Sequence, residues 1–168
     1  MRKILCILLA VCCCMGLFAC KKQEEIPEDS VTVYYKREKP VFGAADGVIA
    51  ATYLDAAGYR DDPAHLLEKY LSANPGEGFV SPFPSGVVLV SYKMEGLTAK
   101  VVLSDTIAQL SGMELTMALT CLTHTVMSMS GCREVIISAA TEQLDGENFV
   151  TLSQDSFLLL DGSGTDSN

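Results

Sequence analysis

The sequence predicts an α+β fold: a mixed, largely antiparallel sheet with two helices packed on one face. Short β-branched runs come before, between and after two stretches of helical periodicity. Glu95-Gly96 separates two such runs closely enough for an antiparallel hairpin. The 168 residues are enough for one domain, and the 49% hydrophobic content is enough for a core.

Residues 1–19 have the features of a bacterial lipoprotein signal peptide. Arg2 and Lys3 precede the uncharged run Ile4–Gly16, which is shorter than the about 20 apolar residues of a membrane-spanning helix. Leu17-Phe18-Ala19-Cys20 then resembles a lipobox, in which the cysteine is acylated, for example by palmitate. We therefore expect a lipid on Cys20 to hold the protein on the outer, extracytoplasmic face of the cell membrane. An ordinary signal peptide or a membrane anchor is the alternative interpretation.

Residues 20–30 are polar and predict a flexible tether between the lipid and a single domain at 31–161, with a disordered tail at 162–168. Of the 12 basic residues, Arg2 and Lys3 leave with the signal peptide, so 10 remain against 21 acidic residues, a net charge of -11. This balance argues against nucleic acid as a partner and against tight adsorption to anionic lipid.

Two cysteines, Cys121 and Cys132, fall within the predicted domain. Cys121 lies in the middle of a predicted helix, and Cys132 lies beyond the end of that helix, which is itself about 13 Å further along at about 1.5 Å per residue. A disulfide needs Cα atoms within about 7 Å of each other. We therefore expect two buried free thiols.

The first half of the domain is predicted as two strands and a helix. Val31–Tyr35 is β-branched and aromatic, and Val48–Leu54 is the second expected strand. Asp62 can cap a helix and Pro63 suits its first position, while Asn74-Pro75-Gly76 ends it.

The stretch Gly76–Gly86 is predicted as a loop, because its prolines exclude a central strand. Strands are expected at Val87–Met94 and Leu97–Leu103. The second helix begins with a capping box, Ser111-Gly112-Met113-Glu114, and ends at Gly131. The remaining strands are expected at Val135–Ile137, Phe149–Leu152 and Phe157–Leu160.

This order of elements resembles the GerMN domain of spore germination and sporulation proteins and of other envelope lipoproteins of Gram-positive bacteria. The resemblance rests on the opening strand, the helix from Asp62-Pro63, the Ser81–Gly86 loop and, best of all, Ala118–Ile137, a helix that leads through Gly into a Val-Ile strand. Thr98–Ser104 also matches, with Val102 where the family has Asp, and this chain has one copy of the domain where well-known members have two. The resemblance implies a fold similar to ring-building modules, no enzymatic activity, and a role in sporulation or germination.

The mature sequence shows no pattern typical of an enzyme or a metal site. His65 and His124 are predicted on different helices, and there is no Cys-x-x-Cys pair. Neither a Gly-x-Ser-x-Gly elbow nor a phosphate-binding Gly-rich loop is present. We therefore expect no catalytic residue, no metal and no cofactor.

The second helix carries one unusual feature. Opposite its apolar core stripe lie five uncharged side chains: Met113, Met117, Thr120, His124 and Met127. Three interpretations are open. The Gly76–Gly86 loop or the chain ends cover this side; or it docks another protein, since Met adapts to different partners; or its three methionines and His124 bind a soft metal.

The loop that contains Phe79 and Phe83 is the second candidate surface, and it either folds onto the core or binds a ligand. The sequence thus predicts a non-catalytic, lipid-anchored module for assembly in the cell envelope, with an envelope protein or a second copy as its partner. A small-ligand or peptidoglycan-binding lipoprotein that uses Phe79 and Phe83 is the alternative.

Overall fold

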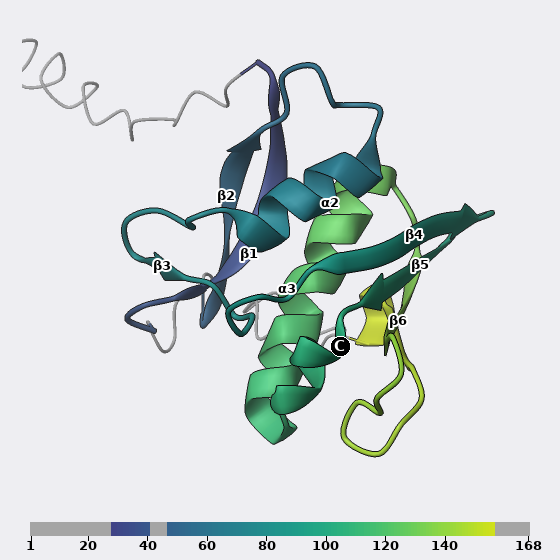
Figure 1. Cartoon of the computed structure of the whole chain (residues 1–168). Coiled ribbons are helices and arrows are strands. Elements are labelled where there is room, and N and C mark those ends of the chain that lie inside the picture. The colour runs from purple at the N-terminus through teal and green to yellow at the C-terminus, as the bar shows by residue number, and fades with distance from the viewer. Residues whose placement is uncertain (1–27, 41–46, 157–168) are drawn as a thin grey trace, which may run out of the picture.

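The computed structural model describes residues 28–40 and 47–156, whose strands form two sheets on either side of a long helix (Figure 1). The predicted lipobox, most of the tether, the strand expected at Phe157–Leu160 and the predicted tail lie outside the described residues. No helix in the described part of the chain is both long enough and apolar enough to cross a membrane.

The first sheet is antiparallel and has the order β2-β1-β3. β1 (Ser30–Arg37) pairs with β2 (Ile49–Asp55) along nearly its whole length, which confirms both predicted strands. β3 (Phe79–Val80) adds only two residues, opposite Arg37 and Lys36. The sequence predicted a loop over this stretch, and that prediction is wrong for these two residues. A strand can form here because the prolines that argue against one come after it, at positions 82 and 84.

The second sheet is mixed and has the order β4-β5-β6-β7. β4 (Leu89–Glu95) and β5 (Thr98–Leu103) form the predicted hairpin, which turns at Gly96 with a φ of 65°. β6 (Glu134–Ala139) is parallel to β5, and β7 (Val150–Ser153) is antiparallel to β6. A parallel neighbour requires a crossover, which α3 supplies.

Two α-helices and two short 3-10 helices complete the described chain: α2 (Pro63–Ser72), α3 (Gly112–Ser130), η1 (Asp105–Gln109) and η2 (Gln154–Ser156). The Asp62 carboxylate caps α2 as predicted, since its Oδ1 accepts a hydrogen bond from the backbone N–H of His65 at 3.1 Å. Gly131 ends α3 in the left-handed conformation that glycine adopts without steric cost.

The capping box predicted for α3 does not form. Ser111 is extended and its side chain caps no backbone group. Instead, the backbone N–H of Gly112 donates to Oδ2 of Asp145, at 3.3 Å and 33 residues away. A carboxylate also suits the positive end of the helix dipole, so a distant loop replaces the local cap.

The α+β class is confirmed, but the layers differ from the single sheet that we expected. α3 lies between the two sheets, with β1 on one side and β6 on the other, while α2 packs across β4 and one end of α3 (Figure 1). The physical reason is the composition of α3, whose only charged residue is Glu114. A helix with so few charged side chains can be covered on more than one side.

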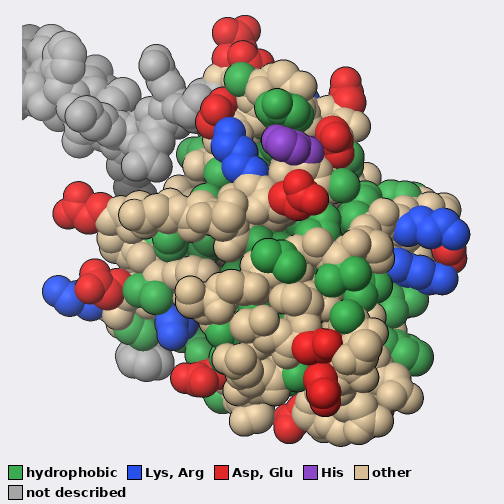
Figure 2. Space-filling view, in the orientation of Figure 1, with side chains coloured by type: hydrophobic (Ala, Val, Ile, Leu, Met, Phe, Trp, Pro, Cys, Tyr) green, Lys and Arg blue, Asp and Glu red, His purple; other side chains and the backbone are tan. Residues whose placement is uncertain are grey.

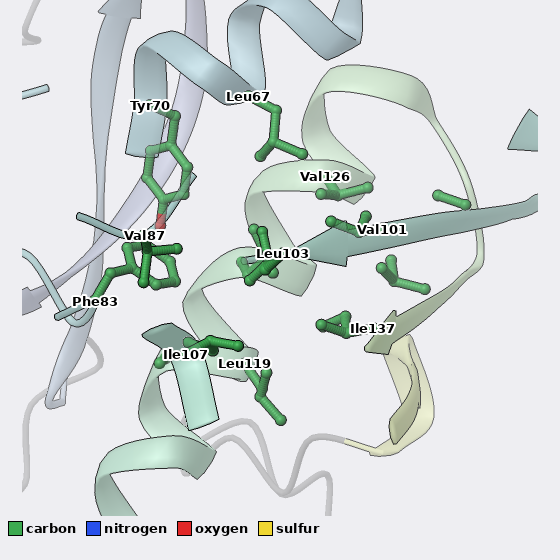
Figure 3. Close-up of a cluster of buried hydrophobic side chains, with 14 of the residues drawn as sticks. Leu67, Tyr70, Phe83, Val87, Val101, Leu103, Ile107, Leu119, Val126 and Ile137 are labelled. Atoms are coloured by element: carbon green, nitrogen blue, oxygen red, sulfur yellow. The ribbon is translucent and has the colours of Figure 1, made fainter. Parts of the chain in front are cut away.

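The core sits between the helices and the second sheet. Val101, Leu103 and Ile137 of that sheet are at most 1% exposed and lie toward α3 (Figure 3). Tyr70 of α2 extends the core toward the loop after β3, where the Phe83 ring meets the Tyr70 ring edge-on, with centroids 5.5 Å apart.

The free edge of β1 is closed by side chains rather than by a strand. β3 ends beside Lys36, so Tyr34 has no strand partner on that side. Its backbone N–H donates to Oγ1 of Thr125 in α3 at 3.0 Å, and its carbonyl accepts from the hydroxyl of Tyr70 in α2 at 2.6 Å. Thr125 is 0% exposed and Tyr70 1%, so water cannot replace either bond.

We expect Thr125→Val and Tyr70→Phe each to lower the free energy of unfolding by about 1–3 kcal/mol, because each leaves a polar group of the Tyr34 backbone unpaired. Urea denaturation measures the loss. The matched control is Thr120→Val, because the Thr120 hydroxyl bonds only the Thr116 carbonyl of its own helix and the change should stay within about 0.5 kcal/mol. An equal cost for Thr120→Val and Thr125→Val would contradict this role of the edge.

Candidate functional site

The five residues of the predicted face of α3 differ in their surroundings. Met113 is 72% exposed, whereas Met117, Thr120, His124 and Met127 are half-buried. Met127 packs against the core cluster. Only the N-terminal end of this face therefore lies open.

The loop that the sequence suggested lies against one end of this face, and β1, which the sequence did not suggest, covers a further part. β1 runs beside α3, and the ring of Tyr34 lies against that of His124, with centroids 5.0 Å apart. The loop after β3 reaches only the Met117 end of the face. Along much of α3, this side therefore lacks charges because β1 lies against it.

Phe79 and Phe83 have different roles. Phe83 is 8% exposed and belongs to the core, as the core-folding interpretation of the loop predicts. Phe79 is half-buried, and the Arg37 guanidinium lies 6.0 Å from its ring centroid. The two rings do not form a joint aromatic surface, because one faces the core and the other contacts Arg37.

A pocket of about 170 Å³ brings the two predicted surfaces together. It lies between the end of β1, the loop after β3 and the first turns of α3. Phe83 and Met117 both line it, although the sequence placed them on separate surfaces. The complete lining is Lys36, Ser81, Pro82, Phe83, Pro84, Leu110, Glu114 and Met117. Lys36 and Glu114 are not among the site residues predicted from the sequence, because nothing in the sequence around them indicates that they line the same pocket.

Hydrophobic side chains also gather over β4, in the middle of the face shown in Figure 2. Val90 in β4 and Val88 just before this strand are each 55% exposed. The pairing with β5 shifts register between Leu89 and Ser91, which makes Val90 a bulge. A bulge at a sheet edge discourages pairing with another strand, so this edge is a weaker docking candidate than α3.

Cys121 and Cys132 are free and buried, as expected. Burial raises the pKa of Cys121 to about 12, so its thiol stays protonated at neutral pH and is not nucleophilic. His65 lies on a different helix from His124. It is half-buried, and its ring stacks on the ring of Tyr59 with centroids 3.8 Å apart. Across residues 28–40 and 47–156, no three His, Cys, Asp or Glu side chains group as a metal site would require.

Partial burial lowers the pKa of His124 below its ordinary value. In the unfolded chain this histidine is protonated as the pH falls through about 6.5, whereas in the folded chain it is protonated only at a lower pH. The contribution to stability is complete above pH 6.5 and is lost as the pH falls toward the lower, folded pKa. We expect the free energy of unfolding, measured in urea, to decrease as the pH is lowered from 7 to 5.

His124→Gln should flatten this dependence, whereas His65→Gln should leave it in place. Carboxylates act in a lower range, because hydrogen bonds to Lys100 and Lys93 lower the pKa of Glu95 to about 2 and backbone hydrogen bonds lower the pKa of Asp105. An unchanged slope in His124→Gln would show that another group is responsible.

Two solved structures that are similar to this fold come from a sporulation protein. The first GerMN domain of the sporulation protein GerM from Bacillus subtilis matches with a TM-score of 0.58 and 15% identity, over 75% of this chain and 98% of that one. The tandem GerMN domains of the same protein match with a TM-score of 0.54 and 19% identity, over 76% of this chain and 46% of that one. At these identities the likeness concerns the fold alone. No curated protein matches the sequence.

The family model named Germane, described as sporulation and spore germination, matches residues 32–145. The match spans β1 to the loop after β6, so it includes α3 and both sides of the pocket. The resemblance inferred from the order of elements is thereby confirmed. The chain belongs to the Germane family of sporulation and spore germination domains.

Proposed function

We propose that this protein is a lipid-anchored, non-catalytic envelope lipoprotein whose Germane domain mediates protein–protein assembly during sporulation or spore germination. The family match supports the process. Cys20 in its lipobox supports the anchor, since acyl chains together hold a protein stably on a membrane. The partner is an envelope protein or a second copy of the chain.

The observation that carries the assembly role is the exposed end of α3. Met113 is 72% exposed at the start of a helix that is otherwise largely covered. The half-buried Met117 lies one turn further along, beside the loop of Pro82 and Pro84. Flexible methionines beside a proline-stiffened loop are typical of surfaces that bind another protein. The docking face proposed here is therefore Met113 and Met117 with this loop, and not the whole stripe to Met127.

A photoreactive residue at position 113 in the native host should crosslink to one discrete partner, identified by mass spectrometry. In a chain without the photoreactive residue, Met113→Glu should then lower co-purification of that partner at least tenfold, because a carboxylate must be desolvated in the interface. Ser128→Glu is the matched control, since it adds the same charge at an exposed position near the other end of α3. Equal recovery from both variants, at unchanged melting temperatures, would exclude the docking face.

The lipid anchor is tested by labelling with radioactive palmitate. The wild-type chain and Cys12→Ala should incorporate label, and Cys20→Ala should not, because only Cys20 stands at the expected cleavage point. Label that persists in Cys20→Ala would place acylation elsewhere or show a different kind of anchor.

A further inference from the structure

The pocket between β1, the loop after β3 and α3 has rigid walls. Lys36 lies where β1 pairs on both sides, with Ile49 of β2 and Val80 of β3. The loop is held by a hydrogen bond from the Phe83 backbone N–H to Oγ of Ser81, at 3.3 Å, and by the Phe83 ring in the core. A site that is already ordered loses little conformational entropy when a ligand binds.

Two opposite charges line this pocket without pairing. The ion pairs among the described residues join Lys69 to Asp55, and Lys93 and Lys100 to Glu95, so neither Lys36 nor Glu114 takes part in one. Lys36 lines the pocket from the end of β1, and Glu114 lines it from the first turn of α3.

This arrangement selects against ligands that carry a single charge. An anion that binds Lys36 in so small a pocket also faces the Glu114 carboxylate, and a cation at Glu114 faces Lys36. A ligand with both charges satisfies both side chains at once.

The volume of the pocket and its other lining residues restrict the class of ligand further. The pocket is smaller than the about 300–1,000 Å³ of sites for drug-sized molecules, so it holds a group of amino-acid size. Phe83, Met117 and the flanking prolines form an apolar part of its wall, and methionine adapts to ligands of different shape.

We propose that this pocket binds a free α-amino acid with an apolar side chain. Its carboxylate pairs with the ammonium of Lys36, its ammonium pairs with the carboxylate of Glu114, and its side chain lies against Phe83 and Met117. The site goes beyond the assembly function and is argued from separate observations, although Met117 and the loop of Pro82 and Pro84 belong both to the pocket and to the proposed docking face.

The test is a titration of the full chain, purified in detergent and labelled with ¹³C on the methionine methyl groups, with L-leucine. Met117→Leu assigns the Met117 signal. We expect this signal to shift and saturate with a Kd of about 1 mM or tighter. N-acetyl-leucine and leucinamide, which each lack one charge, should bind at least tenfold more weakly.

Lys36→Met and Glu114→Gln should each weaken leucine binding about tenfold or more, as expected for the loss of a charge-assisted hydrogen bond. Lys39→Met and Glu68→Gln remove the same charges at exposed positions outside the pocket and should leave the Kd unchanged. Far-ultraviolet circular dichroism verifies that each variant is folded.

Three outcomes would overturn the proposal: no shift of the Met117 signal at about 20 mM leucine, equal binding of the blocked derivatives, or pocket variants with wild-type affinity. The crosslinking test at position 113 is independent of these results. Failure of the ligand site and failure of the assembly role can therefore be told apart.

Discussion

The hydrogen bonds made by the backbone at the free edge of β1 connect the two sheets and the two α-helices of this structure. At Tyr34 the strand has no strand neighbour on one side, and the two polar groups of its backbone bond to Thr125 of α3 and Tyr70 of α2. Both side chains are buried, so these bonds must form inside the protein. They join the first sheet to both helices, and through α3 to the second sheet. The two sheets share no backbone ladder, and α3 holds them together.

This arrangement accounts for the composition of α3. Its core stripe packs against the second sheet, and its opposite side lies along β1, where His124 meets Tyr34. A helix that is enclosed on two sides can carry few charged side chains, because they would be buried. Beyond the end of β1 the cover stops, and the first turns of α3 are left open at Met113. The surface available to a partner is therefore a consequence of where β1 ends.

The same place holds the pocket, which the sequence predicted only in part. Met117 was indicated by the absence of charges on its helix face, and Phe83 by its proline-rich loop. Lys36 lies on an alternating strand and Glu114 in the first turn of a helix, positions where charged residues are ordinary. Their meeting depends on the antiparallel pairing of β1 with β3 and on the angle at which α3 enters. Neither can be read from local sequence.

Local sequence is enough to predict most of the individual elements: the Asp62 cap, the glycine that ends α3, the Gly96 hairpin and the bounds of most strands within one or two residues. Each depends on neighbouring residues through backbone conformation or side-chain periodicity. Three features depend on contacts between distant parts of the chain: the strands divide into two sheets, Asp145 replaces the capping box of α3, and β1 covers much of the uncharged side of α3. Periodicity shows which face of an element is apolar, but many elements could cover that face. The choice is made by packing the whole chain and by pairing every buried polar group.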